Sequence, residues 1–285
     1  MTKKTTKEIS NSTLAKYEKL KALLQRMEKV LIAFSGGVDS TFLLRVAHEI
    51  LQDDVLAVIG SSDIYPQREK GEALNLAQEM GVRCLVIETN ELDNPNFAEN
   101  TPQRCYYCKK ELFSRLKKIA EDESIPYVLD GSNSEDSQDF RPGLQAAAEL
   151  EVRSPLKEVG LKKEEIRVLS KRLGLSTWNK PAFSCLSSRF PYYSKIESKS
   201  LKQVDRAEEY LRNLGFTQFR VRHYQQMARI EIRPDEFSKI IKPAIRNKII
   251  KTFKKLGYIY VNLDLEGYRS GSMNEPLARD VKQKA

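Results

Sequence analysis

The chain contains little histidine, few cysteines and no long hydrophobic run. Its 285 residues include two histidines, His48 and His223, and four cysteines. Two histidines argue against Ser-His-Asp or Cys-His catalysis and against a histidine-rich metal site. The longest apolar runs, residues 30–34 and 55–59, fall far short of the roughly 18 residues that a membrane helix needs. We therefore expect neither a membrane span nor a membrane partner.

The first eleven residues are polar and rich in Lys and Thr, without the apolar segment of a secretory signal. This favours a cytoplasmic location, where four cysteines do not form a disulfide framework. Each cysteine therefore needs its own interpretation. With 40% hydrophobic and 31% charged residues, the composition is that of an ordinary globular protein.

Positive charge is concentrated at the end of the chain. Residues 1–190 carry 28 Lys and Arg against 28 Asp and Glu, whereas residues 191–285 carry 20 against 11. Such an excess predicts either an anionic partner, such as nucleic acid, a nucleotide or a phosphorylated metabolite, or a solvated basic surface. Charge alone does not separate these alternatives.

Short apolar strands alternate with helices in the first half of the chain. A helix at 7–28 precedes expected strands at 30–34, 55–59, 83–88 and 127–130 and expected helices at 40–51, 67–80 and 104–123. This alternation predicts an α/β fold with a parallel sheet and helices on both faces. Ligands of such folds bind beyond the carboxyl ends of the strands. The loops at 35–40, 60–65 and 131–143 follow three of these strand ends.

The second half begins with an expected helix at 162–173, followed by an aperiodic stretch at 177–194 that contains Trp178 and Cys185. Loops of this length in compact domains are usually functional or disordered. A small α+β unit follows, with expected helices at 197–214 and 235–253 and strands at 218–223, 228–232 and 258–265. We therefore predict a nucleotide-binding domain at 1–190 and a small basic substrate or oligomerisation domain at 191–285.

The string SGGVDS at residues 35–40 joins the first of these strands to the following helix. Gly36 and Gly37 allow a tight turn and a close approach of the backbone to a ligand. The amide groups at the start of a helix attract anions, and the hydroxyls of Ser35 and Ser40 add donors. The Gly-Lys-Ser/Thr ending of a Walker loop is absent. The string predicts a phosphate-binding loop, with a plain Gly-Gly turn as the alternative.

The loop at 130–143 is rich in acidic residues and follows the fourth strand. Mg²⁺ commonly binds through one or two carboxylates together with phosphate oxygens, which makes Asp136 a candidate ligand. Arg141 is a candidate phosphate partner, and Gly131 would let an adenosine pass close to the backbone. Ser61, at the end of the second strand, is also assigned to the nucleotide site. The alternative is a polar surface turn.

The cysteines separate into one structural and three functional candidates. Cys84 is expected to be a small buried residue of a strand. Cys105 and Cys108 form a C-x₂-C pair that fits redox, zinc or iron–sulfur chemistry. A structural zinc site needs four ligands, and only Cys185 adds a third thiolate. Three thiolates suit a [4Fe-4S] cluster with one open iron. Alternatively, Cys185 acts alone as a nucleophile activated by Arg189.

Two resemblances sharpen these expectations. Phe34 followed by SGGVDS resembles the PP-loop of the ATP pyrophosphatases, which have an adenine nucleotide alpha-hydrolase-like fold. These enzymes cleave ATP between the α and β phosphates and adenylylate a substrate oxygen. Four further strings resemble the LarE family of ATP-dependent sulfur transferases, which make the nickel-pincer nucleotide cofactor of lactate racemase. They are WNKPAFSCLSSRFPY at 178–192, FRVR at 219–222, ARIE at 228–231 and DLEGYRSGSMN at 264–274.

The LarE resemblance implies a substrate and a mechanism. The substrate is pyridinium-3,5-biscarboxylic acid mononucleotide, whose carboxylate is adenylylated before sulfur replaces oxygen. Some members sacrifice the sulfur of the cysteine that matches Cys185 and retain dehydroalanine. Others resemble cluster-dependent enzymes and also have cysteines that match Cys105 and Cys108. Because this chain has all three, we favour the [4Fe-4S] route. Lys109 and Lys180 are candidates to assist the transfer.

The resemblance also implies which residues bind ATP and the substrate. ATP with Mg²⁺ would bind to Ser35, Gly36, Gly37, Val38, Asp39 and Ser40. Two arginines at alternate positions of one strand point to the same face, which suits a phosphate clamp. The substrate phosphate would therefore bind to Ser188, Arg189, Arg220 and Arg222, with Glu231 as a second candidate magnesium ligand.

The expected partner is this small nucleotide, in a homo-oligomer that does not bind nucleic acid. A PP-loop tRNA thiolase is the alternative enzyme, and a non-catalytic adenine-nucleotide sensor is the alternative from another class. RNA-dependent adenylylation would distinguish the first, and cleavage of ATP to AMP and pyrophosphate would exclude the second.

Overall fold

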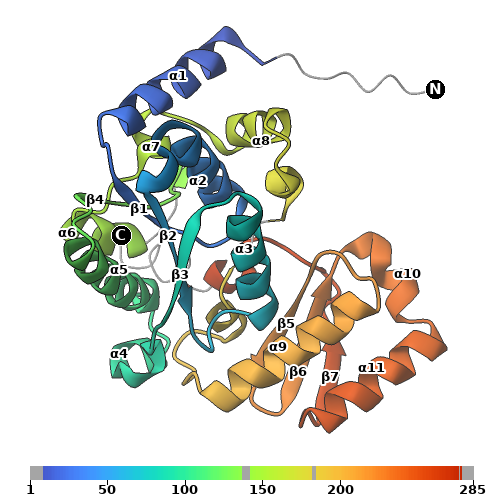
Figure 1. Ribbon diagram of the computed structural model, residues 1–285. Helices are drawn as coiled ribbons and strands as arrows, with labels where there is room; N and C mark the ends of the chain where they lie inside the picture. The colour runs from blue at the N-terminus through green and yellow to red at the C-terminus, as the bar shows by residue number, and fades with distance from the viewer. Residues whose placement is uncertain (1–8, 137–141, 182–183, 276, 278–285) are drawn as a thin grey trace, which may run out of the picture. The chain divides into compact units, whose positions relative to one another are not determined.

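The computed structural model describes residues 9–136, 142–181, 184–275 and 277 (Figure 1). The chain forms two compact units that are interleaved in the sequence. Unit 1 consists of Met1–Ser62, Gln67–Asn90 and Cys105–Phe183, and unit 2 of Asp63–Pro66, Glu91–Arg104 and Ser184–Ala285. Among the described residues, no helix is long and apolar enough to cross a membrane.

Unit 1 contains the predicted parallel sheet. Its strands are β1 (Val30–Ala33), β2 (Val55–Ser61), β3 (Arg83–Glu88) and β4 (Tyr127–Leu129). They are arranged in the order β3-β2-β1-β4, and every pair is parallel. In β1, Val30 and Ile32 belong to one hydrophobic core and Leu31 to another. A strand buried on both faces explains why its sequence is a continuous apolar run.

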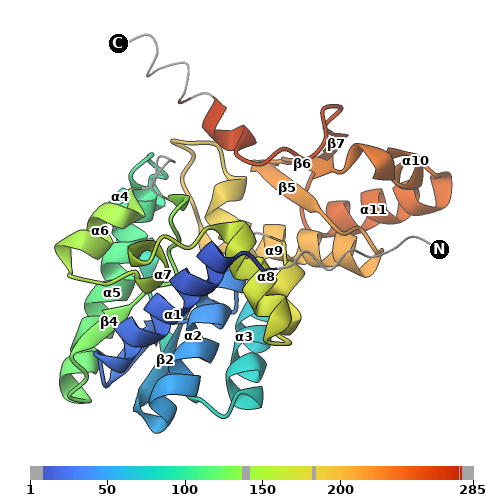
Figure 2. The ribbon, with the colours of Figure 1, turned by 90° about the horizontal axis from the view of Figure 1, so that it is seen from above.

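Helices cover both faces of this sheet, as predicted (Figures 1 and 2). One core joins the sheet to α1 (Asn11–Gln25), α2 (Val38–Leu51), α3 (Gln67–Glu79), α7 (Pro155–Glu158) and α8 (Lys163–Arg172). The other core joins it to α5 (Arg104–Asp122) and α6 (Gly143–Glu149). Short elements between residues 52 and 189 include η1 (Gln52–Asp54), η2 (Glu91–Asp93), α4 (Pro95–Ala98), η4 (Ser176–Asn179) and η5 (Leu186–Arg189).

The expectation that Cys84 is a small buried residue of a strand is met only in part, because Cys84 packs against the core without being fully covered. Cys84 lies on β3, an edge strand of the sheet, and is half-buried. Its strand neighbour Val86 is 41% exposed. An edge strand has a sheet neighbour on one side only, so its side chains are less covered than those of β1.

Unit 2 contains a three-stranded mixed sheet. Its elements are α9 (Ser198–Asn213), β5 (Phe219–Tyr224), β6 (Met227–Ile232), η6 (Pro234–Glu236), α10 (Phe237–Ile240), α11 (Pro243–Lys255), β7 (Tyr260–Leu263) and η7 (Ser272–Asn274). The order is β5-β6-β7, with β5 antiparallel and β7 parallel to β6. Val221 and Ile230 share a core with Leu211 of α9 and Phe253 of α11.

The expected single helix at 235–253 is wrong, because this segment forms η6, α10 and α11. Proline lacks an amide hydrogen and its ring clashes with a preceding helical turn. Pro243 therefore interrupts the helix and occupies the first turn of α11, where its missing donor costs little.

Candidate nucleotide site and sulfur-transfer residues

The SGGVDS loop lies at the carboxyl end of β1 and leads directly into α2. Gly36 has a φ of +65°, and a Cβ there would lie 2.8 Å from the Cβ of Ala73 on α3. Gly37 is the N-cap of α2, and no side chain among the described residues caps this helix start. The first amide groups of α2 are therefore available to an anion, as the predicted phosphate role requires.

Two serine hydroxyls hold the loop in shape. The Oγ atoms of Ser35 and Ser40 are 3.0 Å apart, and the amide of Ser35 donates to Ser40 Oγ at 3.4 Å. The amide of Gly37 donates to Ser35 Oγ at 3.4 Å. These contacts connect both ends of the turn through the chain's own side chains.

Asp39 has one paired and one unpaired carboxylate oxygen. Lys163 Nζ donates to Asp39 Oδ2 at 2.5 Å. Among the described residues, Asp39 Oδ1 is buried without a hydrogen-bond partner. Burial raises the pKa of Asp39, although Lys163 opposes this shift. A buried carboxylate oxygen without a donor suits a hard cation such as Mg²⁺, so the residues present fit this ion.

Gly131 follows β4 and lies against the phosphate loop. A Cβ at this position would lie 2.9 Å from the backbone nitrogen of Ser40 and 3.1 Å from its Cα. The close approach that requires glycine is therefore to the start of α2, whereas the sequence predicts an approach to adenosine. Because β2 and β4 flank β1 and their connections leave in opposite directions, this is a switch point of the sheet.

The acidic loop after β4 contains one structural carboxylate and one metal candidate. Asp130 Oδ2 accepts from Ser132 Oγ at 2.7 Å, and its Oδ1 accepts from Ser154 Oγ at 2.6 Å. Asp136 accepts from the amide of Asn133 at 2.9 Å, and its charge acts on Asp39. Arg141, the predicted phosphate partner, lies outside the described residues.

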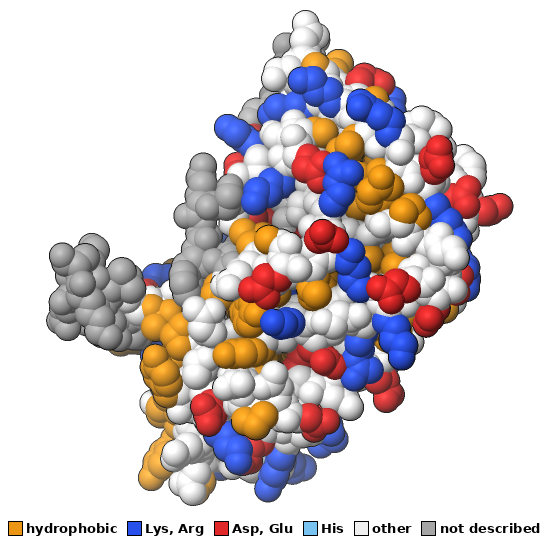
Figure 3. Space-filling model, turned by 90° about the vertical axis from the view of Figure 1, so that its left-hand side faces the viewer, with side chains coloured by type: hydrophobic (Ala, Val, Ile, Leu, Met, Phe, Trp, Pro, Cys, Tyr) orange, Lys and Arg blue, Asp and Glu red, His pale blue; other side chains and the backbone are white. Residues whose placement is uncertain are grey.

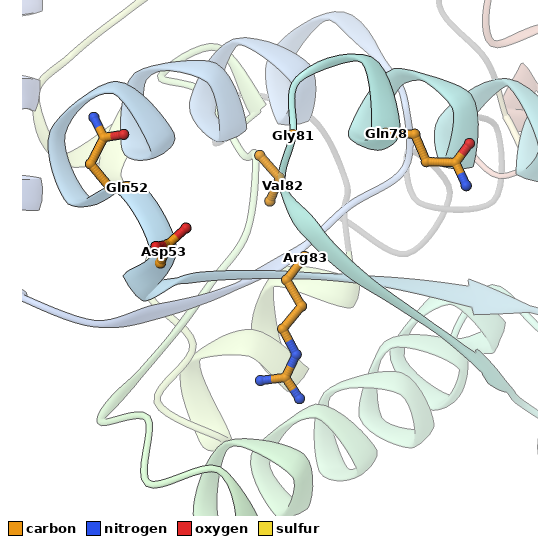
Figure 4. Close-up of a pocket in the computed structure, with 6 residues that line it drawn as sticks. All are labelled: Gln52, Asp53, Gln78, Gly81, Val82 and Arg83. Carbon is orange, nitrogen blue, oxygen red and sulfur yellow. The ribbon is translucent and has the colours of Figure 1, made fainter.

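Ser61 ends β2 and is buried. Lys70 of α3 donates to its hydroxyl at 3.1 Å. A separate hollow lies at the amino end of the sheet (Figure 4). It is lined by Gln52, Asp53, Gln78, Gly81, Val82 and Arg83, near the amino ends of β2 and β3. Figure 4 shows its polar side chains spread apart rather than converging, so we assign it no role.

The three predicted sulfur-transfer cysteines come from both units. Cys105 is exposed and Cys108 is buried, and they lie in the first turns of α5 in unit 1. Cys185 is half-buried and precedes η5 in unit 2. Among the described residues, no three His, Cys, Asp or Glu side chains form a group that could hold a metal. The three-thiolate cluster therefore stays a prediction.

Arg189 holds the loop that contains Cys185. Its guanidinium is fully buried, and Nε and Nη2 each donate to a carboxylate oxygen of Glu208 at 2.9 Å. Its Nη1 donates to the carbonyls of Ser184 and Cys185 at 2.7 and 2.9 Å and to Ser188 Oγ at 2.8 Å. Burial lowers the pKa of Arg189, but Glu208 outweighs this effect and holds the pKa above its ordinary value.

Arg222 and Glu231 form a second buried pair in unit 2. Arg222 donates to both carboxylate oxygens of Glu231, at 2.9 and 2.7 Å, and to the carbonyl of Ser188 at 2.9 Å. Arg229 lies 3.2 Å from Glu231 as well. The structure thus brings Ser188, Arg189 and Arg222 together. Both oxygens of Glu231 bind arginines, which competes with the predicted magnesium role.

Arg220 occupies a different environment from the other two arginines. Its guanidinium lies 5.1 Å from the ring centroid of Tyr268, and it donates to its neighbour's carbonyl, that of Phe219, at 2.7 Å. Burial lowers the pKa of Arg220, and the positive charge of Arg189 adds to this shift. A half-buried cation beside an aromatic ring is a suitable partner for a phosphate.

Part of the positive charge of unit 2 lies on the exposed surface of α11. Lys248, Lys251, Lys254 and Lys255 of α11 are exposed. Figure 3 shows the face on the left-hand side of Figure 1, away from α11, and basic and acidic side chains are interspersed there. For α11, the exposure of these four lysines favours the interpretation as a solvated basic surface.

Comparison with known proteins places the chain in a family. Residues 13–121 match the NAD synthase family. Pyridinium-3,5-bisthiocarboxylic acid mononucleotide synthase of Lactiplantibacillus plantarum is 39% identical over 94% of this chain and 97% of its own length. An uncharacterized protein of Synechocystis sp. is 43% identical over 93% and 99% of the two chains. One subunit of the glutamine-hydrolyzing GMP synthase of Methanococcus vannielii is 26% identical over about half of each chain, 52% and 50%.

The fold and the SGGVDS loop define a PP-loop nucleotide-binding domain joined to a small mixed-sheet unit. The chain belongs to the LarE family, that of pyridinium-3,5-bisthiocarboxylic acid mononucleotide synthase. Membership identifies it as an ATP-dependent enzyme.

Proposed function

We propose that the protein adenylylates a carboxylate of pyridinium-3,5-biscarboxylic acid mononucleotide and converts it into a thiocarboxylate. The observation that carries this proposal is a PP-loop at the switch point of the sheet, in a chain that resembles a thiocarboxylate-forming synthase over 94% of its length. The negatively charged phosphate of that mononucleotide is complementary to the positively charged residues around Ser188. We also propose a cytoplasmic homo-oligomer, whose size analytical ultracentrifugation would report.

The first half-reaction makes the carboxylate reactive. One carboxylate oxygen attacks the α-phosphorus of ATP, the bond to the β-phosphate oxygen breaks, and pyrophosphate leaves. The amide groups of α2 and the hydroxyls of Ser35 and Ser40 stabilise the charge that develops on pyrophosphate. Asp39 and Asp136 would hold Mg²⁺, which supplies charge neutralisation when bound. The product is an acyl adenylate, from which AMP leaves far more readily than hydroxide leaves a carboxylate.

The second half-reaction replaces AMP with sulfur. Cys105, Cys108 and Cys185 are proposed to hold a [4Fe-4S] cluster, and thiolates are the ligands that such clusters require. When bound, the cluster would supply a sulfide to the acyl carbon. Arg189 positions the Cys185 loop through its bonds to the carbonyls of Ser184 and Cys185.

The alternative sulfur source is Cys185 itself. Its thiolate would displace AMP and form a thioester. Loss of the Cα proton and cleavage of the Cβ–S bond would then leave the thiocarboxylate and dehydroalanine. This route uses each protein molecule once, so the amount of product distinguishes it from a catalytic cluster.

For the substrate phosphate, we propose Ser188 and Arg220 as direct partners. Arg189 and Arg222, which the sequence assigns to the same role, each bind a carboxylate bidentately. In this proposal they fix the position of Ser188 and add positive charge around the phosphate. Replacement of Arg220 by Met should raise the KM for the mononucleotide and leave the KM for ATP unchanged.

The deciding experiment is anaerobic turnover with ATP and the biscarboxylate mononucleotide, with mass spectrometry of the product and assays of pyrophosphate and AMP. We expect thiocarboxylate and about four irons per chain, with absorption near 400 nm, as a [4Fe-4S] cluster requires. Iron should be lost when Cys105, Cys108 or Cys185 is replaced by Ala. Iron-free protein after reconstitution would refute the cluster. Pyrophosphate release that requires tRNA would refute the proposed substrate.

A further inference from the structure

Lys180 places a positive charge inside the phosphate loop. It directly follows η4 in unit 1, and its Nζ donates to the carbonyl of Gly36 at 3.3 Å. The same nitrogen lies 2.8 Å from Glu69 Oε2 and 3.1 Å from Glu72 Oε2, both on α3. The side chain of Lys180 is only 17% exposed. One ammonium group thus contacts one loop carbonyl and two carboxylates.

The backbone beneath this side chain is anchored independently. Arg167 of α8 donates to the carbonyl of Trp178 at 2.8 Å and to that of Lys180 at 2.9 Å. The contact between Gly36 and Ala73 already joins the loop to α3. The loop and α3 therefore approach each other closely at a second point besides the Lys180 contacts. Its flexible four-carbon stem can move the ammonium while the backbone stays in place.

The ammonium of Lys180 can pair either with Glu69 and Glu72 or with a phosphate bound in the loop. Arg68 donates to Glu72 at 2.6 Å, so Glu72 keeps a cationic partner when Lys180 moves away. Because that contact remains, moving the ammonium leaves at most one of the two carboxylates without a cation. Phosphate oxygens in the loop would be stronger acceptors than the neutral carbonyl of Gly36.

We propose that Lys180 is an ATP phosphate-binding residue and that Glu69 and Glu72 hold its ammonium beside Gly36 until the nucleotide binds. The inference rests on the proposed use of ATP, and it concerns the β and γ phosphates rather than the adenosine. The two carboxylates compete with phosphate for the same ammonium. Their removal and the removal of Lys180 therefore have opposite effects on ATP affinity.

The test is isothermal titration of the purified full-length chain with ATP, pyrophosphate and AMP. Lys180→Met is expected to weaken ATP and pyrophosphate binding about 10- to 100-fold, since a charge-assisted hydrogen bond is lost. AMP should change less than about twofold. Glu69→Gln is expected to tighten ATP binding, and Lys180→Arg should keep most of the affinity.

The matched control is Lys171→Met. Lys171 lies on the same α8–η4 segment, with its Nζ 4.8 Å from the ring centroid of Trp178. Equal weakening by Glu69→Gln and Lys180→Met would identify a structural tie and overturn the proposal. Equal weakening of AMP binding by Lys180→Met would do the same. ATP-dependent thiolation of tRNA would refute the proposed substrate and leave the Lys180 result standing, whereas a wild type that binds neither ATP nor pyrophosphate would refute both.

Discussion

The Arg189–Glu208 pair allows the stability of unit 2 to be separated from the order of the Cys185 loop. Both side chains are buried, at 1% and 5% exposure, and they share two hydrogen bonds of 2.9 Å. Glu208→Gln keeps the size of the side chain but leaves the guanidinium charge without its counterion. Breaking a buried pair in this way costs about 3–5 kcal/mol.

Replacing both partners gives a different result. Arg189→Met with Glu208→Leu removes both charges and fills similar space, which is often neutral or stabilising. Two costs remain: the amide of Val221 loses its acceptor, Glu208 Oε1 at 2.9 Å, and the carbonyls of Ser184 and Cys185 lose the Arg189 donor. An unsatisfied buried amide costs about 1–3 kcal/mol. The double variant should therefore be more stable than Glu208→Gln and less stable than the wild type.

The two variants should rank in the opposite order for thiolation activity, with Glu208→Gln more active than the double variant. The double variant lacks the Arg189 bonds to the carbonyls of Ser184 and Cys185. We expect it to lose thiolation and to keep ATP binding, because the PP-loop belongs to unit 1. Glu208→Gln retains Arg189 and should retain measurable thiolation at temperatures where unit 2 is folded.

The assay is urea unfolding followed by circular dichroism, with Glu209→Gln as the control. Glu209 is the exposed neighbour of Glu208 on the same helix, and its replacement should change stability by less than about 0.5 kcal/mol. A loss of less than about 1 kcal/mol for Glu208→Gln would contradict the reasoning. So would a double variant that is no more stable than Glu208→Gln.

The same pair gives a pH dependence with a defined sign. Burial raises the pKa of Glu208, but Arg189 outweighs it, and the pKa in the folded state is lowered. A lowered folded-state pKa stabilises the fold above the unfolded pKa, about 4.3 for Glu, and this contribution disappears as the pH falls through the folded value. Wild-type stability should fall below about pH 4 more steeply than that of the double variant.

Three further predictions concern the PP-loop and Cys84. Gly36→Ala should weaken ATP binding at least about tenfold in a titration, because a φ of +65° costs a side chain roughly 1–2 kcal/mol and the added Cβ would approach Ala73 at 2.8 Å; unchanged affinity would contradict this. Gly131→Ala should lower both the melting temperature and ATP affinity, because its Cβ would lie 2.9 Å from the nitrogen of Ser40; a wild-type melting curve would argue against the close approach. Burial raises the pKa of Cys84 to about 11. Iodoacetamide labelling at pH 8, followed by mass spectrometry, should therefore modify Cys84 at least about tenfold more slowly than an exposed thiol, and equal rates would disprove this.

The sheet was predictable because its signals are local and periodic. Each strand is a short apolar run, and the expected strand at 83–88 coincides with β3. The helix after the PP-loop begins at Val38 rather than at residue 40, because the last residues of the loop already form its first turn. The interruption of the helix at Pro243 could also have been predicted from the sequence, since proline in a helix interior removes a backbone donor.

The hydrogen-bond partners of Arg220 and Arg222 could not be predicted from the sequence in the same way. Alternation along β5 correctly predicts that Arg220 and Arg222 share a face. It does not predict that Glu231 on β6 is close enough to bind Arg222 at both oxygens. Register between strands is set by the turn and the core, which single residues do not report. A strand pattern therefore gives the face of an arginine but not its partner.

The carboxylate partners follow from a general requirement on sites for anionic ligands. Such a site needs positive charge, yet an unpaired charge in a half-buried loop is costly before the ligand arrives. Asp39 meets this need for Lys163, as Glu69 and Glu72 do for Lys180. Each acid is separated from its lysine by more than 100 residues, so spacing along the sequence cannot reveal the pair. We therefore interpret a lysine beside an acid at a strand end as a group that binds the ligand and is paired with the acid beforehand, rather than as a surface ion pair. The opposite effects on ATP affinity expected for Lys180→Met and Glu69→Gln test that interpretation.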